Sequence, residues 1–531
     1  MALDIVAFVR QLTTPGFTPT AADLANMRAV GDWLCAGYKQ LDDQNQDLVV
    51  AAVKAGMASP NPAIAAIAFN ITHVLSADVK YFAEALIRMF GMEADTEFLN
   101  GNFFSLAVQG FNRSLPDPDG ASTLLSREYL HAFYSKIVRQ IEAQRIEDGV
   151  DIRQDFRHTG RAVVLATQIT APPHAPTVDA LKFADYLQRQ FGKEVLVVNS
   201  MQFSPEAGGA MVPSAKASEN PDLRGCRTIT YGDQQFAYFQ PAEARFSRQG
   251  IAATIRAIEA FDPEIVISVG SSNMLSELFA ARAFCFRYPT DADVPLTLTN
   301  FFHTWKEPTA EMLDVVQREG LSDLYLFHKH PGFDVPVKQK HFARADFGIP
   351  EDAFVFGMVG TRLQHDVDTA CMDALEALLE KAPNAYIAFA GTFPTYQIAL
   401  LGRPLLKARS CFTGFQTDIM AFHDLCDGYI NPHRKGGGSA IIYAMAAGLP
   451  AVSTSYGDAA QALVDLPHVA DYAALVELAS KIACDAEFAS DYAAKCKEAS
   501  LKLTSRKPLM DMIMYAFDQF AEGRDAMRAA S

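Results

Sequence analysis

The chain has 531 residues, which is enough for two or three domains. Half of the residues are hydrophobic and 20% are charged, the composition of a globular protein with packed cores. The formal net charge of −16, from 46 basic and 62 acidic residues, argues against nucleic acid as the main partner, because binding a phosphate backbone needs a broad basic face.

The cysteines and the N-terminus indicate a reducing compartment. The 8 cysteines are scattered along the chain without a paired or zinc-like spacing. The first residues lack the basic start and the long apolar core of a secretory signal, and no run approaches about 18 apolar residues. We therefore expect a cytoplasmic protein with no transmembrane segment and no metal site.

Residues 1–157 are predicted to form an all-helical N-terminal domain. Thr20 and Asp23 are typical of a capping signal before a helix that runs to about Gln40. Apolar residues at three- and four-residue spacing predict further helices over 48–57, 62–75, 78–90 and 126–145. Nothing in this region suggests catalysis, so we expect it to bind a protein partner or to mediate oligomerisation.

Residues 158–335 alternate between predicted strands and helices. The continuous apolar run 162–167 is typical of a buried parallel strand. Further strands are expected at 195–198, 228–231, 236–239, 265–269 and 296–299, and helices at 177–191, 242–260 and 274–283. This alternation predicts a Rossmann-like domain whose functional residues follow the carboxyl ends of the strands.

Two loops of this domain are candidates for function. His174 follows the first strand between Pro173 and Pro176, where it suits a general base or a donor to an anionic group. A solvated loop histidine is the alternative. Gly270 and Ser271 follow the strand 265–269 and predict a helix start with free N–H groups on the acceptor side.

Residues 336–505 repeat the α/β alternation. Strands are expected at 355–359, 385–390, 411–413, 428–430 and 451–454, and helices at 368–381, 395–401, 417–425 and 439–447. A helical tail covers about 472–522. Two α/β domains in tandem predict a ligand site in a cleft between them.

The run Asn431–Ala451 reads N-P-H-R-K-G-G-G-S-A-I-I-Y-A-M-A-A-G-L-P-A. It predicts a strand end, a loop of three glycines and a helix that starts at Ser439. A helix N-terminus presents unpaired N–H groups and a positive dipole end, and Arg434 and Lys435 add full charges beside it. The pattern indicates a phosphate or diphosphate site. A flexible connector is the alternative, because a G-G-G loop before a helix is often only that. The run matches neither G-x-G-x-x-G nor the P-loop, so it indicates neither a dinucleotide-binding fold nor an NTPase.

Residues 160–525 resemble the GT-B glycosyltransferases, and among them the retaining, family-four-like enzymes. The resemblance depends on V-G-T-R-L at 359–363, on T-G-F-Q at 413–416, and above all on A-M-A-A-G-L-P-A-V at 444–452. It implies two Rossmann-like domains, here preceded by an all-α domain, with the last helix (residues 506–531) crossing back to the first of them.

The resemblance also implies a donor site. Arg362 looks like the family's arginine that contacts the donor diphosphate, and Phe415 and Gln416 occupy the loop that receives the nucleobase. We expect a catalytic set of His174, Arg362 and Lys435, and donor contacts from Phe415, Gln416, Arg434, Gly436, Gly437, Gly438, Ser439, Tyr443 and Asp458. Gly270 and Ser271 are expected on the acceptor side.

Three positions depart from the family pattern. The family commonly has a pair of glutamates where Lys435 and Tyr443 stand, and a lysine where Val367 stands. Tyr443 has one hydroxyl and cannot replace a bidentate carboxylate at the nucleotide ribose. We expect Lys435 and Arg434 to replace the missing cation.

The expected function is metal-independent transfer of a sugar from a nucleoside-diphosphate sugar to a protein or glycan acceptor. The leading candidate for the donor is a UDP-sugar. No D-x-D pair stands at a strand end and no bound cofactor is expected. Retention of configuration is implied by the resemblance alone. The alternatives are a sugar-nucleotide epimerase or hydrolase of GT-B shape, and a catalytically degenerate binding protein.

Overall fold

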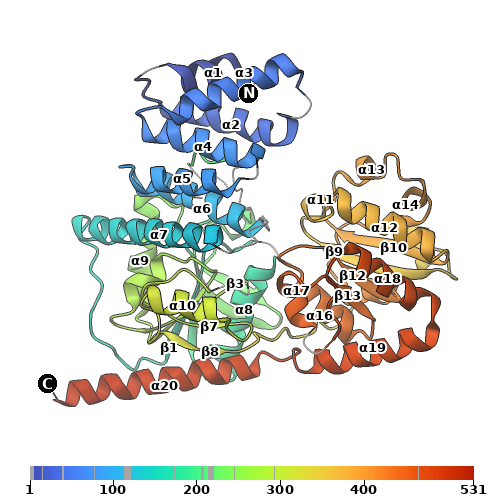
Figure 1. The fold of residues 1–531 in the computed structure, drawn as a ribbon. Coiled ribbons are helices and arrows are strands. Elements are labelled where there is room, and N and C mark those ends of the chain that lie inside the picture. The colour runs from blue at the N-terminus through green and yellow to red at the C-terminus, as the bar shows by residue number, and fades with distance from the viewer. Residues whose placement is uncertain are drawn as a thin grey trace.

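The computed structural model describes residues 5–14, 16–38, 41–76, 78–112, 121–170, 174–204, 209–212, 220–243, 245–291, 294–463 and 466–530. Within these residues it shows an all-helical N-terminal region, an eight-stranded sheet and a five-stranded sheet, with helices packed on both sheets (Figure 1). The predicted fold class, two Rossmann-like α/β units preceded by an all-α region, is confirmed.

The N-terminal helices begin where the sequence provides caps. Thr20 Oγ1 accepts a hydrogen bond from the N–H of Asp23, and the Asp23 carboxylate accepts one from the N–H of Thr20, so the predicted capping signal is confirmed. Helices α1 and α6 were not predicted. The helices are α1 (Ile5–Thr13), α2 (Ala21–Gly37), α3 (Asp43–Met57), α4 (Pro62–Ser76), α5 (Val79–Phe90), α6 (Thr96–Asn112) and α7 (Ala121–Glu147).

The helical region and the first sheet share one hydrophobic core. Phe103 of α6 and Ile137 of α7 are fully buried in the same cluster as Val163 and Leu165 of the central strand β1 (Arg161–Ala166). Helices α6 and α7 therefore cover one face of this sheet, as Figure 1 shows.

The first sheet has the order β3-β4-β2-β1-β5-β6-β7-β8. All its neighbouring strands are parallel except β3 and β4, which form an antiparallel pair. Besides β1, its strands are β2 (Glu194–Asn199), β3 (Thr228–Tyr231), β4 (Gln234–Phe239), β5 (Ile265–Val269), β6 (Phe284–Tyr288), β7 (Phe301–Thr304) and β8 (Tyr325–His328). The helical segments are α8 (Ala175–Arg189), η2 (Pro221–Leu223), α9 (Arg248–Phe261), η3 (Leu275–Phe279) and α10 (Ala310–Arg318).

The prediction of a strand at 296–299 was wrong. In the described residues this segment forms no strand, because the N–H groups of Leu298 and Thr299 donate to the Glu277 carboxylate instead of to a neighbouring strand. The next strand, β7, begins after this segment, at Phe301. The helix expected over 274–283 is only the short 3-10 helix η3, and β6, β8 and α10 were not predicted.

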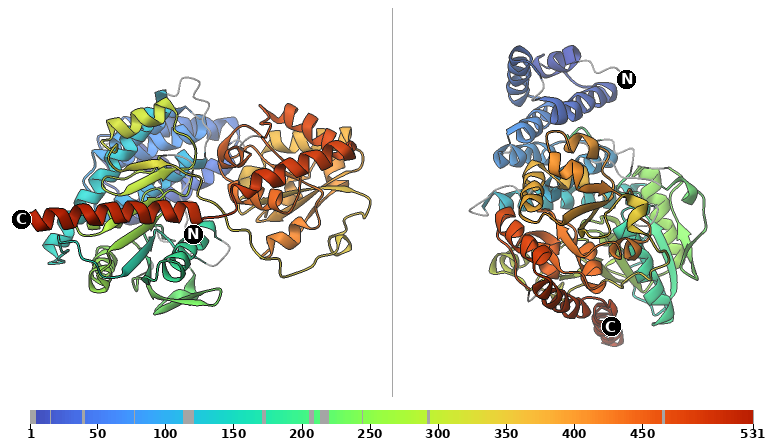
Figure 2. Two further views of the ribbon diagram at one scale, coloured as in Figure 1. Left: turned by 90° about the horizontal axis from the view of Figure 1, so that it is seen from below. Right: turned by 90° about the vertical axis from the view of Figure 1, so that its right-hand side faces the viewer.

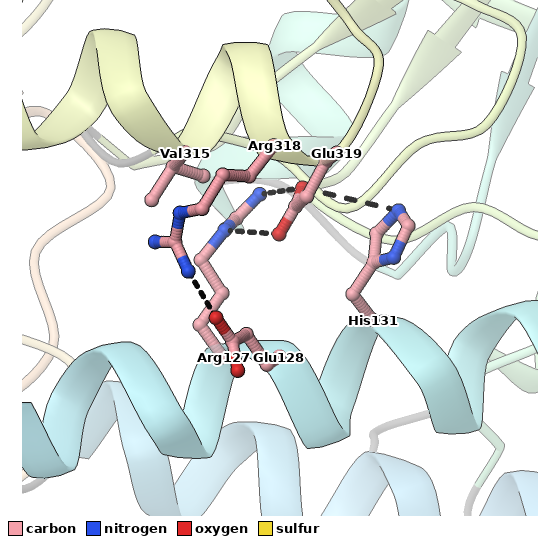
Figure 3. A pocket seen from close by; sticks show the side chains of 6 residues that line it. All are labelled: Arg127, Glu128, His131, Val315, Arg318 and Glu319. Atoms are coloured by element: carbon pink, nitrogen blue, oxygen red, sulfur yellow. Dashed lines mark hydrogen bonds and ion pairs between the residues drawn. The ribbon is translucent and has the colours of Figure 1, made fainter.

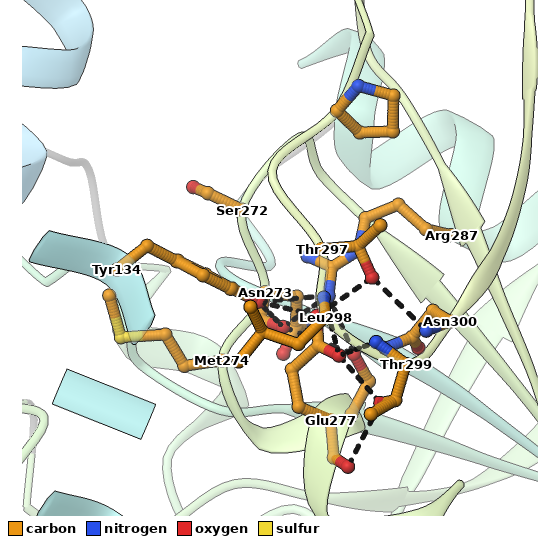
Figure 4. Close-up of polar contacts among 12 residues, drawn as sticks. Tyr134, Ser272, Asn273, Met274, Glu277, Arg287, Thr297, Leu298, Thr299 and Asn300 are labelled. Atoms are coloured by element: carbon orange, nitrogen blue, oxygen red, sulfur yellow. Dashed lines mark hydrogen bonds and ion pairs between the residues drawn. The ribbon is translucent and has the colours of Figure 1, made fainter. Parts of the chain in front are cut away.

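Glu277 is the centre of a buried polar network (Figure 4). Its Oε1 accepts hydrogen bonds from Tyr134 Oη of α7 at 2.7 Å and from Arg287 Nη2 of β6 at 2.6 Å. The side chains of Arg287 and Glu277 are 0% and 1% exposed. The network therefore ties the helical region to the middle of the first sheet.

The second sheet has the order β11-β10-β9-β12-β13 and is parallel throughout. Its strands are β9 (Phe354–Gly360), β10 (Ala385–Gly391), β11 (Ser410–Phe412), β12 (Gly428–Asn431) and β13 (Ala451–Ser453). The helical segments are η4 (Arg344–Phe347), α11 (Leu363–Asp366), α12 (Thr369–Lys381), α13 (Tyr396–Ala399), α14 (Pro404–Ala408), α15 (Ile419–His423), α16 (Gly438–Ala446), α17 (Gly457–Ala462), α18 (Tyr472–Cys484) and α19 (Ala486–Leu501).

The last helix, α20 (Lys507–Ala530), returns to the first sheet (Figures 1 and 2). Its Phe517 and Phe520 rings contact the Phe284 ring of β6 at centroid distances of 6.0 and 5.7 Å. Just before α20, the fully buried Arg506 donates from Nη2 to Asp179 of α8 at 2.5 Å. The two α/β units are thus joined by a helix and by a buried ion pair.

No helix among the described residues combines the length and the apolar character that crossing a membrane requires.

Removal of the Glu277 carboxylate is expected to destabilise the protein strongly. Glu277→Ala leaves the buried Arg287 guanidinium without its counter-ion, which typically costs about 3–5 kcal/mol. Asp511→Ala is the control, because Asp511 forms an exposed pair with Lys507 that contributes about 0.3–0.5 kcal/mol. Thermal and urea unfolding of both variants measure the difference. Equal unfolding curves would contradict a structural role for the network.

Candidate functional site

The predicted donor residues gather at one edge of the second sheet. The strands β9, β12 and β13 are parallel, so the loops that follow them meet at their carboxyl ends. Arg362 follows β9, the glycine loop follows β12, and Gly457 follows β13. This edge is the candidate site.

The glycine loop has a backbone that other residues would strain. Gly437 has a φ of +102°, and a Cβ built there would overlap Asn431 Oδ1. Gly457 has a φ of +76°, and a Cβ there would overlap the carbonyl oxygens of Arg434 and Lys435. The loops after β12 and β13 therefore touch backbone to backbone, and α16 begins at Gly438, one residue before the predicted Ser439.

Arg362 lies beside this loop. Its Nη2 is 3.8 Å from a Cβ built at Gly436, and its side chain is half-buried. Lys435 is also half-buried. The structure therefore brings together two cations predicted as catalytic, Arg362 and Lys435, with Gly436 and the start of α16.

Arg434 points inward and fastens the loop to β9. It is 8% exposed, and its Nη2 donates to the carbonyl oxygen of Val359 at 2.7 Å. Its Nη1 pairs with Asp366 at 3.0 Å, and its Nε donates to Asn431 Oδ1 at 3.0 Å. The charge of Arg434 is therefore balanced inside the protein, and its visible effect is on the shape of the loop.

Tyr443 and Asp458 face the first α/β unit. Burial raises the pKa of Tyr443 above its ordinary value, and the Asp179 carboxylate of α8 raises it further while Arg506 opposes the rise. Burial also raises the pKa of Tyr288, at the end of β6, with smaller contributions from Asp179, Tyr443 and Asp458. The carboxyl edges of the two sheets thus meet near α16 and α17, which lie beside α8 in Figure 1.

The predicted nucleobase loop follows β11 at the same edge. The carbonyl oxygen of Gly414 accepts a hydrogen bond from the N–H of Gly391 at 2.8 Å, which fixes the loop to the end of β10. Gln416 Nε2 donates to the carbonyl oxygen of Thr413 at 2.5 Å. The Phe415 side chain is 47% exposed, so its ring is available for stacking.

His174 stands immediately before α8 as a neutral imidazole. Its Nδ1 lies 2.9 Å from Thr177 Oγ1 and its Nε2 lies 3.3 Å from Gln168 Nε2. Burial lowers the pKa of His174 to about 4, and the Asp179 carboxylate opposes this shift. Both hydrogen-bond partners belong to the first α/β unit. Pro173, which was expected to constrain this histidine, lies outside the described residues.

Gly270 and Ser271 do not open a helix with free N–H groups, as was expected. The N–H of Gly270 donates to the carbonyl oxygen of Tyr288 at 3.1 Å. Ser271 Oγ donates to Asp291 Oδ2 at 3.1 Å and accepts from the N–H of Thr290 at 3.2 Å. The loop after β5 is therefore held by the loop after β6. The 3-10 helix η3 begins only later, at Leu275.

His433 and Tyr456 were not among the predicted site residues, although both lie in the loops of the candidate site. Their rings stack at a centroid distance of 4.6 Å beside the glycine loop. A signal was present, because His433 belongs to the N-P-H-R-K run and Tyr456 directly precedes Gly457.

A surface pocket of about 290 Å³ lies between α7 and α10 (Figure 3). Arg127 pairs with Glu319 at 2.9 Å, and Arg318 pairs with Glu128. The arginines and glutamates that line the pocket therefore neutralise one another between α7 and the C-terminal end of α10. We assign the pocket to the packing of α10 on α7. In the described part of the chain, no group of three His, Cys, Asp or Glu side chains could hold a metal ion.

Substitution of Gly437 is expected to disrupt the loop. Gly437→Ala places a Cβ against Asn431 Oδ1 and forces a non-glycine residue into positive φ, which alone costs about 1–2 kcal/mol. Gly523→Ala in α20 is the matched control, because nothing lies within 4 Å of a Cβ there. Thermal unfolding should show a loss for Gly437→Ala and no loss for the control. An unchanged melting temperature for Gly437→Ala would contradict the loop geometry.

The comparison with protein families concerns this same region. Residues 339–495 match the family model described as glycosyl transferases group 1. A comparison with curated protein sequences found no match.

Similar solved structures include a mutant O-GlcNAc transferase of Thermobaculum terrenum, with 12% identity, 100% coverage of both chains and a TM-score of 0.46. Anabaena Alr3699/HepE in complex with UDP-glucose has 14% identity and a TM-score of 0.45, over 67% of this chain and 99% of that one. A glycosyltransferase from Rickettsia africae has 11% identity and a TM-score of 0.45, over 70% and 100%.

The matched region contains Arg362, the glycine loop and α16. Residues 339–495 are therefore similar to the glycosyl transferases group 1 family, and the protein is a glycosyltransferase with two α/β units.

Proposed function

We propose that the protein transfers a sugar from a nucleoside-diphosphate sugar, in first place a UDP-sugar, to a protein or glycan acceptor, without a metal ion and with retention of configuration. The observation that carries this proposal is the position of Arg362 beside the glycine loop at the start of α16, within the region that matches the glycosyltransferase model.

The chemical task is to stabilise negative charge that grows on the leaving diphosphate while the sugar acquires oxocarbenium character. The first N–H groups of α16 have no partners within the helix and carry the positive end of its dipole. Arg362 and Lys435 add full positive charge beside them. These groups are placed before the reaction begins, so little reorganisation is needed when the charge develops.

The three cations of the site divide into two roles. Arg434 is paired with Asp366 inside the protein, so it supports the loop rather than the donor. Arg362 and Lys435 are the cations that we propose to face the diphosphate. Phe415 and Gln416 receive the nucleobase. Tyr443 offers one hydroxyl to the ribose, a weaker contact than the family's carboxylate.

His174 is proposed to orient the sugar or the acceptor from the first α/β unit. Its pKa of about 4 means that the imidazole is neutral at pH 7, so it acts as a hydrogen-bonding group or as a base and not as a cation. Gly270 and Ser271 shape the neighbouring loop on the proposed acceptor side. The N-terminal helices, which share a core with this unit, are the proposed surface for a protein acceptor or partner.

Arg362→Ala and Lys435→Ala are each expected to lower kcat by at least tenfold, which corresponds to about 1.4 kcal/mol of transition-state stabilisation. Lys407→Ala in α14 is the control, because Lys407 is exposed and belongs to the same α/β unit. The assay incubates the protein with a panel of donors and detects released UDP, GDP or other nucleotides by mass.

The same panel separates the alternatives. Near-wild-type rates in both variants would remove the proposed site. An epimerised donor without nucleotide release would indicate an epimerase. Thermal stabilisation by a nucleotide without any turnover would indicate a degenerate binding protein.

The pH profile tests the state of His174. Because its pKa is lowered to about 4, the neutral imidazole is present above that pH and is lost only as the pH falls through it. We expect His174→Gln to reduce kcat/KM without removing any inflection between about pH 6 and 7, the range in which an unperturbed histidine titrates. An inflection in that range that disappears in His174→Gln would contradict the neutral assignment.

A further inference from the structure

The imidazole of His433 is exposed, yet its position is fixed from several sides. Its face stacks on the Tyr456 ring at 4.6 Å with an angle of 17° between the planes. Its Nδ1 lies 3.1 Å from Thr454 Oγ1, and its backbone N–H donates to Tyr472 Oη at 3.0 Å. Fixing an exposed side chain costs conformational entropy, so such a fixed histidine differs from an ordinary solvated one.

The stacked pair belongs to the two loops that form the proposed diphosphate site. His433 stands two residues before Lys435, and Arg434 between them is buried and turned inward. Tyr456 directly precedes Gly457, whose Cα packs on the carbonyl oxygens of residues 434 and 435. A change in the glycine loop would therefore move the imidazole with it.

The chemistry of the exposed edge suits a hydroxyl group. Thr454 Oγ1 lies at hydrogen-bond distance from Nδ1, so Nε2 is the second ring nitrogen with which this exposed residue can contact a ligand. A neutral imidazole nitrogen donates or accepts one hydrogen bond, depending on the tautomer that its other nitrogen selects. In a nucleoside-diphosphate sugar, the diphosphate joins the nucleoside ribose to the transferred sugar, and the transferred sugar carries several hydroxyls.

We propose that His433 hydrogen-bonds a hydroxyl of the donor sugar through Nε2 and thereby contributes to the choice of sugar. Thr454 and Tyr456 are positioning residues that hold the ring. This inference rests on the proposed function, because it requires a donor diphosphate bound at the start of α16.

The test compares sugars that differ at one hydroxyl. The probes are UDP-glucose, UDP-galactose, UDP-N-acetylglucosamine and UDP-N-acetylgalactosamine, and kcat/KM is measured for each with the full-length protein. His433→Ala is expected to lower kcat/KM about tenfold or more for the preferred donor and to reduce its preference over the C4 epimer, because the contact to one hydroxyl is lost. UDP affinity by calorimetry should stay within about twofold of wild type, because the diphosphate contacts remain.

Two further variants distinguish contact from folding. Thr454→Val removes the partner of Nδ1 and should cause a smaller loss in the same direction, with a similar melting temperature. If His433→Ala unfolds, His433→Asn replaces it in the comparison of donors, because asparagine changes the polarity of the position less. His341→Ala is the control, because His341 is an exposed histidine of the segment that leads into the second sheet.

The inference is overturned if His433→Ala and His433→Asn keep the wild-type ratio between the epimers, or if UDP affinity falls as much as turnover does. Failure of the proposed function looks different, because then the wild-type protein itself releases no nucleotide from any donor. That result would remove both.

Discussion

The inward ion pair of Arg434 is the constraint on which the candidate site depends. Its guanidinium joins Asn431 at the end of β12, Val359 in β9 and Asp366 in α11, so three segments of the second sheet meet at one side chain. Gly437 passes so close to Asn431 that no side chain fits there. With the loop fastened in this way, the start of α16 lies next to Arg362, where we propose that the donor diphosphate binds.

The second constraint is the connection between the two α/β units. Arg506 is fully buried, pairs with Asp179 and lies 5.1 Å from the centroid of the Phe183 ring. Removing either charge would leave the other buried without a partner, which is costly. Because Asp179 also acts on the pKa of Tyr443, the junction and the proposed donor site are electrostatically linked. The relative position of the two sheets therefore bears directly on the chemistry.

Much of the fold followed from periodicity and from glycine chemistry. Long apolar runs predicted β1, β5 and β10, and the glycine loop with its helix predicted the edge where Arg362 lies. The errors came from contacts distant in sequence. Residues 296–299 look like a strand, but Glu277 binds their N–H groups. Sequence alone also could not show that Arg434 turns inward while Lys435 is only half-buried, since both are basic neighbours in one loop.

The common core of α6, α7 and the first sheet has a consequence for how the protein can be divided. A fragment that began at β1 would keep α9 and η3 on this face of the sheet but would expose the part of the face that α6 and α7 cover. Such a fragment would aggregate or bind another apolar surface. Gain or loss of the whole helical region is therefore restricted to steps that also replace this cover. Helix α2 is tied to the first α/β unit as well, because Arg28 Nη1 donates to the carbonyl oxygen of Gly209 at 3.0 Å.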